Sequence, residues 1–312
     1  MSFAAPVRLF VRNVQTRNSS NVAFIGLGQM GKRMAANLIS KGQSLKVYDT
    51  VPAAAASVKG AQQCGSAEEA AKDANIVITM LPNGDIVKET LLGEKGILKG
   101  IPKKSILVDC STIEPQMAKE LSTISQKNSI RFIDAPVSGG VTGAQAGTLT
   151  FMTGGQETDV KEVEPFLLKM GAKIFHCGNI GAGQTAKLCN NLILAITMIG
   201  TCEAMNLGVN SGLDPKLLTA IVNVSTGRSW SSDTYNPVPG VMPNVPSSNN
   251  YEGGFSVPLI AKDLGLAERA ALNSGSPLPL GALAHQLYRA LLLNGYEEKD
   301  FSVVYKFLKG KK

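Results

Sequence analysis

Histidine, tryptophan and paired cysteine are scarce in this chain. Among 312 residues there are two histidines, one tryptophan and five cysteines, and no two cysteines stand in a CxxC spacing. An odd number of cysteines without that spacing argues against both a disulfide framework and a zinc site. We therefore expect reduced thiols and no metal centre, and structural roles for His176 and His285, which lie far apart in the sequence.

Long hydrophobic runs are also lacking. The most apolar segment, Leu192 to Thr201, has ten residues, whereas a membrane-spanning helix needs about 20. This segment predicts a buried helix, and no membrane partner is expected. Because it is apolar nearly all round, it also fits a helical domain that joins a homodimer or homotetramer.

Positive charge is concentrated at the two ends of the chain. The net charge is +7, but the last four residues contain three lysines and the first twenty contain three arginines. The body between them is nearly neutral, and basic and aromatic residues do not interleave as they do in a single-strand binding groove. The sequence therefore predicts no nucleic-acid partner.

The first twenty residues differ in composition from the rest. They contain Arg8, Arg12 and Arg17, several Ser, Thr and Asn residues, and no acid. This is typical of a mitochondrial transit peptide, whereas Arg8 and Arg12 interrupt the apolar centre that a secretory signal needs. We expect residues 1–20 to direct the protein to the mitochondrial matrix; a disordered tail without a targeting role is the alternative.

A glycine-rich turn follows the first strongly apolar segment. Val22 to Ile25 leads into Gly26-Leu27-Gly28-Gln29-Met30-Gly31, and apolar residues then recur at helical spacing. In a dinucleotide-binding turn the first glycine permits the tight turn, the second lets a pyrophosphate approach, and the third allows close helix packing. The diphosphate then binds at the helix N-terminus. A glycine-rich turn without a ligand is the alternative.

A second apolar segment, Leu45 to Tyr48, ends at Asp49. A carboxylate about 20 residues after the glycines accepts hydrogen bonds from an adenosine ribose. Neither Arg nor Lys occurs among residues 50–52 to welcome a 2′-phosphate. The sequence therefore predicts NAD rather than NADP.

Strand and helix patterns alternate up to about residue 180. Further strands are expected at 76–80, 106–109, 130–134, 149–153 and 173–176, and helices at 66–72, 115–125 and 159–170. Such alternation predicts an α/β fold with a Rossmann-type, doubly wound and mainly parallel sheet. After Gly183 we expect only helices, at 184–211, 214–224, 257–274, 279–294 and 301–308, interrupted by a long polar excursion at 225–254.

These patterns divide the chain into an NAD-binding Rossmann domain at residues 21–182 and an all-helical substrate and oligomerisation domain at residues 183–312. Ligands of open parallel sheets bind outside the carboxyl ends of the strands. Turns rich in small residues follow the expected strands there, at 81–84, 110–112 and 135–140. They suit a nicotinamide, a ribose and a substrate anion.

Lys187 and Asn191 stand four residues apart near the start of the helical part, so they share one face of a helix. A dehydrogenase that oxidises an alcohol needs a group to take the hydroxyl proton. A lysine serves near neutral pH only if burial lowers its pKa from about 10.4 by roughly three units. From spacing alone, an ordinary charge near the helix start is an equally good interpretation.

Four motifs in order resemble the β-hydroxyacid dehydrogenase family. They are the glycine pattern from Gly26, Asp134-Ala135-Pro136-Val137-Ser138-Gly139-Gly140, Gly183-x-x-x-Lys187-x-x-Asn190-Asn191, and Lys262-Asp263-Leu264. The resemblance extends from Val22 to Leu308. It implies NAD-dependent oxidation of 3-hydroxyisobutyrate to methylmalonate semialdehyde in valine breakdown.

The resemblance also implies residue roles. Lys187 is the implied general acid/base, and Asn191 the residue that orients the substrate. Ser138, Gly139 and Gly140 are implied to hold the substrate carboxylate. Around the nicotinamide the implied residues are Leu81, Pro82 and Thr112, with Lys262 closing over the cofactor. Ile86 departs from the pattern, because an Asn is expected four positions after the proline.

Two further expectations concern the excursion and the function. Trp230, beside Arg228 and Tyr235, is expected to be buried at the mouth of the site or at an interface. Competing functions are a related short-chain hydroxyacid dehydrogenase, a semialdehyde or glyoxylate reductase, and a catalytically silent cofactor-binding module. A silent module has no need of Lys187, which disfavours it.

Overall fold

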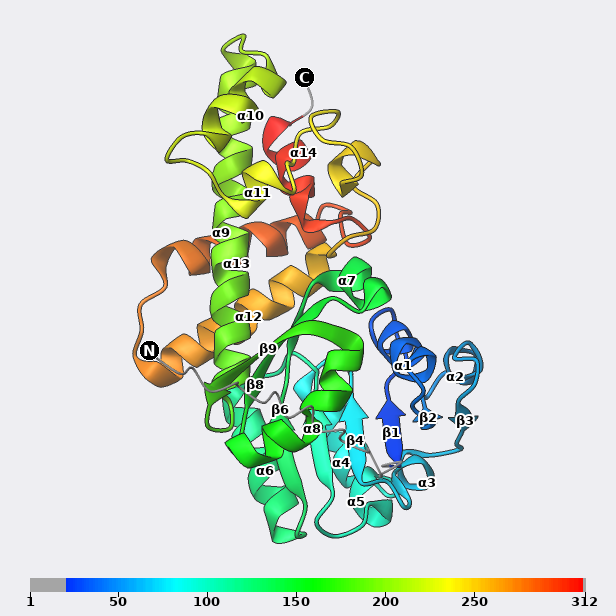
Figure 1. The fold of residues 1–312 in the computed structure, drawn as a ribbon. Helices are drawn as coiled ribbons and strands as arrows, with labels where there is room; N and C mark the ends of the chain where they lie inside the picture. The colour runs from blue at the N-terminus through cyan, green and yellow to red at the C-terminus, as the bar shows by residue number, and fades with distance from the viewer. Residues whose placement is uncertain (1–20, 311–312) are drawn as a thin grey trace, which may run out of the picture.

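The computed structural model describes residues 21–310. A sheet covered by helices forms one half, and a group of helices forms the other (Figure 1). A single helix, α9 (Ala182–Asn210), runs from the edge of the sheet through the whole helical half. The basic segment expected to be a transit peptide, residues 1–20, lies outside the described residues.

The sheet confirms the expected α/β architecture. Its strands are β1 (Val22–Ile25), β2 (Leu45–Tyr48), β3 (Gln62–Gln63), β4 (Ile76–Thr79), β5 (Ile106–Asp109), β6 (Arg131–Asp134), β7 (Val137–Ser138), β8 (Leu149–Gly154) and β9 (Gly171–Gly178). The strand order is β3-β2-β1-β4-β5-β6-β8-β7, with β9 paired to β8. All pairs from β3 to β6 are parallel, β8 runs antiparallel to β6 and β7, and β9 is parallel to β8.

Both faces of the sheet are covered, which explains why its strands are apolar without alternation. Val22 and Phe24 face one core cluster, and Ala23 and Ile25 face the other. The first cluster is covered by α1 (Gly31–Ser40), α2 (Pro52–Ala56), α7 (Gly140–Ala146) and α8 (Glu157–Met170). The second is covered by α3 (Ala67–Ala71), α4 (Gly84–Leu92), α5 (Ile97–Gly100) and α6 (Pro115–Lys127).

The helical half packs around α9. It contains α10 (Pro215–Asn223), α11 (Trp230–Asp233), α12 (Val257–Ser274), α13 (Pro279–Leu292) and α14 (Val304–Lys309), and the 3-10 helices η1 (Pro246–Ser248) and η2 (Phe301–Val303). The long helices agree with the expected ranges to within two residues. The short elements β3, β7, α7, α11 and η1 were not expected, because each of these segments is too short to display a hydrophobic periodicity.

By length and composition alone, α9 is the one helix within residues 21–310 that could cross a membrane. In the fold it is the central helix instead. Met198, Cys202 and Met205 belong to the core of the helical half. Three polar residues, Gln184, Lys187 and Asn191, are buried nearer its start. Packing against α12, α13 and α14 explains the apolar residues on one face of α9, whereas Ile193 and Leu207 of the same helix are exposed.

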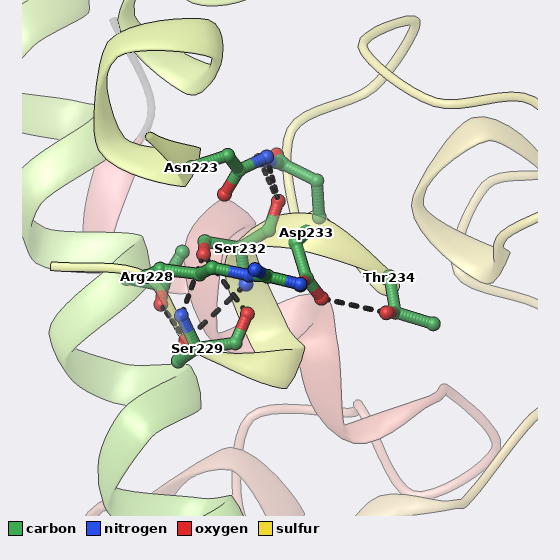
Figure 2. A network of polar contacts seen from close by, with 8 residues as sticks. Asn223, Arg228, Ser229, Ser232, Asp233 and Thr234 are labelled. Carbon is green, nitrogen blue, oxygen red and sulfur yellow. Dashed lines mark hydrogen bonds and ion pairs between the residues drawn. The ribbon is translucent and has the colours of Figure 1, made fainter. Parts of the chain in front are cut away.

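Short-range hydrogen bonds order the first part of the expected excursion at 225–254 (Figure 2). Ser229 and Ser232 form a reciprocal capping box at the start of α11. Asn223 donates a hydrogen bond to the carbonyl of Ser232, and Arg228 pairs with Asp233 at 2.7 Å. The Arg228 pair is exposed, so we assign it little stabilisation.

Asp300 joins the excursion to the C-terminal helices. Its Oδ2 accepts hydrogen bonds from the Tyr235 hydroxyl at 2.9 Å and the Phe255 amide at 2.8 Å. Its Oδ1 accepts from the Ser302 amide at 3.0 Å. The carboxylate is fully buried, and burial raises its pKa despite these donors. Losing a bonded carboxylate here leaves buried donors unpaired.

We therefore expect Asp300→Asn to lower the free energy of unfolding by about 2 kcal/mol, because the NH2 group of Asn replaces one of the two acceptor oxygens and faces donors that it cannot bind. Urea unfolding followed by circular dichroism measures this change. Tyr288→Phe is the matched control, since the fully buried Tyr288 hydroxyl has no hydrogen-bond partner within residues 21–310. Equal destabilisation of the two variants contradicts the anchoring role of Asp300.

Candidate functional site

The loops that follow β1, β4, β5 and β6 gather at one edge of the sheet. β1 pairs with β2 on one side and β4 on the other, so the chain order reverses direction at β1. In doubly wound sheets such a switch point opens a crevice at the carboxyl ends of the strands. Apart from Asp49, which follows β2, the predicted site residues that precede α9 lie on these loops or just beyond them.

The three glycines of the first loop differ in what surrounds them. A Cβ at Gly26 would meet the carbonyl of Met80, and one at Gly31 would meet the carbonyl of Gly26. Gly26 also has a φ of 92°, which favours glycine. A Cβ at Gly28 would meet nothing within 4 Å. Packing of the protein thus explains why Gly26 and Gly31 are glycines. It does not explain Gly28, where the lack of a side chain instead leaves room for a ligand.

The amides of this loop are suited to an anion. Hydrogen bonding of α1 begins with the Lys32 amide donating to Gly28 and the Met34 amide to Met30. Within residues 21–310, the amides of Gly28, Gln29 and Met30 donate to no backbone acceptor. Unpaired amides at the N-terminus of a ten-residue helix are the usual receptor for a diphosphate. The loop therefore fits the diphosphate of a dinucleotide.

Asp49 directly follows β2 and lies beside this loop. Its Oδ2 accepts a hydrogen bond from the Leu27 amide at 2.6 Å, and its Oδ1 accepts from the Val51 amide at 2.8 Å. A carboxylate has about four acceptor positions, so each oxygen can accept a further hydrogen bond from a ribose hydroxyl. Asp49 thus fixes the glycine loop and presents acceptors at the same place.

The loops after β4 and β5 are tied to each other and to the helical half. The Leu81 amide donates to Ser111 Oγ at 2.9 Å. Lys262 of α12 donates through Nζ to the carbonyl of Pro82 at 3.1 Å and the carbonyl of Thr112 at 3.2 Å. The structure thereby brings together Leu81, Pro82, Thr112 and Lys262, four residues named from the sequence.

Lys187 is buried, with 8% of its surface exposed. Burial lowers the pKa of its ammonium group, the nearby positive charge of Lys262 lowers it further, and the negative charge of Asp263 opposes both. The direction is the one a proton acceptor needs near neutral pH. Lys187 is therefore not a solvent-exposed charge near the helix start.

Asn191 and Asp263 join α9 to α12. The Asn191 side-chain amide donates to Asp263 Oδ2 at 2.6 Å, and Asp263 is only 3% exposed. From the sequence, Asp263 was named only as part of the Lys262-Asp263-Leu264 motif and was given no part in the site. Its only signal in the sequence was a carboxylate on the apolar face of α12.

Ser138, Gly139 and Gly140 lie just beyond the carboxyl end of β6. Ser138 ends β7 opposite Thr150 of β8, and its hydroxyl has no hydrogen-bond partner within residues 21–310. Gly139 and Gly140 have φ values of 131° and 59° and begin α7. These conformations favour glycine, so the backbone turns sharply where the motif predicts anion binding.

Ile86 lies on the first turn of α4, and its side chain is exposed. Its amide donates to Asn83 Oδ1 at 2.9 Å, so Asn83 caps the helix. The position therefore faces away from the core of the protein, and an apolar side chain there is tolerated.

Trp230 was expected to be buried at the mouth of the site or at an interface, and within residues 21–310 it is buried at neither. Its side chain is 48% exposed, and one face of its ring stacks on Tyr235 with 4.6 Å between centroids. Tyr235 in turn stacks on Phe301. This aromatic stack covers a single face of the indole, because α11 carries it at the surface of the helical half.

Comparisons with known proteins agree with this geometry. Residues 21–178 match the family described as the NAD binding domain of 6-phosphogluconate dehydrogenase. Residues 181–308 match the one described as NAD-binding of NADP-dependent 3-hydroxyisobutyrate dehydrogenase. The mitochondrial 3-hydroxyisobutyrate dehydrogenase of Mus musculus is 53% identical over 92% of this chain and 87% of its own length.

Two bacterial relatives are also close. The NAD-dependent L-serine dehydrogenase of Pseudomonas aeruginosa is 48% identical over 91% of this chain and 96% of its own length. The structure of Mycobacterium tuberculosis 3-hydroxyisobutyrate dehydrogenase with L-serine superposes with a TM-score of 0.89. It is 39% identical, and the match covers 93% of this chain and 99% of that one.

The space around Gly28 leads to a test of the diphosphate site. We expect Gly28→Ala to keep the wild-type melting temperature but to weaken dinucleotide binding by about tenfold, which corresponds to about 1.4 kcal/mol. Titration of NADH fluorescence measures the affinity. Gly200→Ala is the control, because Gly200 also lies in open space, on α9. Unchanged affinity in Gly28→Ala argues against a diphosphate at this loop.

Proposed function

The chain belongs to the 3-hydroxyisobutyrate dehydrogenase family, and from this we propose that it oxidises 3-hydroxyisobutyrate to methylmalonate semialdehyde, a step of valine breakdown. It is an oxidoreductase whose cofactor is a nicotinamide dinucleotide. The observation that best supports the oxidation of an alcohol is the buried Lys187, one helical turn from Asn191, beside Lys262 and the loops at the carboxyl edge of the sheet.

In the proposed reaction, the neutral amine of Lys187 takes the proton from the substrate hydroxyl while a hydride leaves the carbon that carries this hydroxyl. When bound, NAD supplies the acceptor for that hydride. Burial favours the neutral amine before the reaction. In the reverse direction the ammonium form of Lys187 returns the proton to the aldehyde oxygen. Each direction thus uses one protonation state of the same group.

The remaining residues hold the substrate. We assign the carboxylate of the substrate to the Ser138 hydroxyl and the amides of Gly139 and Gly140, and the orientation of its hydroxyl end to Asn191. The Asn191 side chain is already fixed by its hydrogen bond to Asp263. Lys262 keeps the loops at Pro82 and Thr112 against the helical half. Leu81, Pro82 and Thr112 are assigned to the nicotinamide side.

We further propose NAD over NADP. Asp49 supports this choice, because its carboxylate is ready to accept ribose hydroxyls and would repel a 2′-phosphate. The relative from Pseudomonas aeruginosa is named as NAD-dependent, although one matching family is described as NADP-dependent. The assignment therefore rests on Asp49 and on the absence of Arg and Lys from residues 50–52.

L-serine is a second candidate substrate. It shares a carboxylate and a primary hydroxyl with 3-hydroxyisobutyrate, and carries an ammonium group where the latter has a methyl group. The names of the relatives from Pseudomonas aeruginosa and Mycobacterium tuberculosis both include L-serine. The same Lys187 chemistry would serve either substrate.

The wider organisation is proposed on the same basis. Residues 21–182 would bind the cofactor, and residues 183–312 would complete the substrate site and form a homodimer or homotetramer. Exposed apolar side chains of the helical half, such as Ile193, Leu207 and Leu283, support an oligomer. The mitochondrial names of relatives and the basic first twenty residues support a place in the mitochondrial matrix.

The test is the appearance of reduced nicotinamide absorbance when the purified protein receives 3-hydroxyisobutyrate with NAD, and separately with NADP or with L-serine. We expect turnover with NAD far above NADP. Lys187→Met should lower kcat by about a hundredfold to ten-thousandfold, the range of general base catalysis, and leave NADH affinity unchanged. Lys161→Met is the control, because the Lys161 side chain is exposed, and it should keep the activity of wild type. Full activity in Lys187→Met refutes the assignment of the base.

Asp263 generates a pH prediction. The rate of oxidation should rise with pH as Lys187 loses its proton, and the carboxylate of Asp263 raises the pKa of Lys187. Asp263→Asn removes that charge and retains an oxygen that can accept from Asn191. We therefore expect the rising limb of kcat/KM against pH to move to lower pH. A profile that stays in place, or moves to higher pH, contradicts this coupling.

A further inference from the structure

The first turn of α9 is capped by a residue from the sheet rather than by its own sequence. Gly181 precedes the helix and offers no side chain. Asp134, at the end of β6, accepts hydrogen bonds from the Gly181 amide at 2.7 Å and the Gln184 amide at 2.9 Å. Since Asp134 is fully buried, the start of α9 has a fixed place on the sheet.

The side chain of Gln184 extends this connection to the loop after β5. It is fully buried, its Nε2 donates to the Ser111 carbonyl at 2.8 Å, and its Oε1 accepts from the Ile113 amide at 3.1 Å. The two bonds hold the backbone on both sides of Thr112. The carbonyl of Thr112 itself accepts from Lys262.

Close packing leaves this joint little freedom. A Cβ at Gly183 would meet the carbonyl of Met152, and would stand 2.8 Å from Asp134 Oδ2. Two further hydrogen bonds fix Ser111: its amide donates to Asp109 Oδ1 at 3.1 Å, and its hydroxyl accepts from the Leu81 amide. Gln184 therefore connects α9 to both loops assigned to the nicotinamide.

Gln184 and Lys187 are three residues apart in a continuous helix, so their side chains leave the same face about one turn apart. A helical turn is rigid compared with a loop. If the loop at Thr112 moves relative to Gln184, the residues assigned to the nicotinamide therefore move relative to Lys187 by a similar distance.

We infer that Gln184 is a positioning residue, which sets the distance between the nicotinamide-lining loop at Thr112 and the amine of Lys187. The inference rests on the proposed function insofar as Lys187 is the base. Gln184 itself is fully buried, and we assign it no contact with the substrate. It acts through two hydrogen bonds, and displacement of reacting groups by about 1 Å can cost a hundredfold in rate.

The first variant is Gln184→Met, which preserves the approximate volume and removes both hydrogen bonds. We expect kcat to fall at least tenfold, the KM for the hydroxyacid to change less than threefold, and the Ile113 amide to exchange its hydrogen faster. Ser105→Ala is the matched control. It removes a buried hydrogen bond to the Ala74 carbonyl at the opposite end of the same strand, β5, and should leave kcat within twofold of wild type.

The second variant, Gln184→Glu, adds a readout that a structural role alone does not move. The protonated carboxyl group can donate to the Ser111 carbonyl and accept from the Ile113 amide, whereas the carboxylate can only accept. Burial keeps the introduced carboxyl protonated to higher pH than usual. The ratio of its kcat to that of wild type should therefore be near one at low pH and fall as pH rises.

The outcomes separate this inference from the proposed function. In an enzyme that Lys187→Met inactivates, wild-type kcat in Gln184→Met, or a pH-independent ratio for Gln184→Glu, overturns the positioning role. Turnover that survives Lys187→Met instead overturns the base, and with it the reason for positioning. If wild type oxidises L-serine rather than 3-hydroxyisobutyrate, the proposed substrate is wrong and the same variants are compared on L-serine.

Discussion

The carboxylate of Asp134 holds the two halves of the molecule together. It lies at the end of a sheet strand and accepts hydrogen bonds from the first turn of a 29-residue helix. Because that helix is the central element of the helical half (Figure 1), its start decides where Lys187 and Asn191 stand relative to the carboxyl edge of the sheet. Gly183 allows this approach, since any side chain there would meet the sheet backbone.

Electrostatics at the proposed site follow from the same arrangement. Burial of Lys187 disfavours its charged form, and Asp263 limits how far the pKa of Lys187 falls. Asp263 is buried only because α12 packs across α9, and it is bonded there by Asn191. Lys262, the next residue on α12, reaches the loops of the sheet instead. Of these two adjacent residues, Asp263 thus contacts Asn191, which is assigned to the substrate, and Lys262 contacts the loops assigned to the nicotinamide.

Local sequence patterns predicted much of the fold for identifiable reasons. Strands buried on both faces are continuous apolar runs, α10, α12 and α13 carry helical periodicity, and α9 is a long and mainly apolar segment, so the bounds of these elements agree closely with the structure. Two-residue strands such as β7 and the short helix α11 lack such a signal. Trp230 was misjudged because an aromatic stack on Tyr235 shields only one face of its ring.

The sequence by itself determined the order of strands and helices, the glycine turn with Asp49 after it, and the placing of Lys187 and Asn191 on one helical face. These are properties of neighbours along the chain, where steric and hydrogen-bonding preferences act within a few residues. The burial of Lys187, the part played by Asp263 and the joint made by Asp134 and Gln184 were decided by the tertiary structure. Their partners lie between 47 and 76 residues away along the chain, and only packing of the two halves brings such groups into contact.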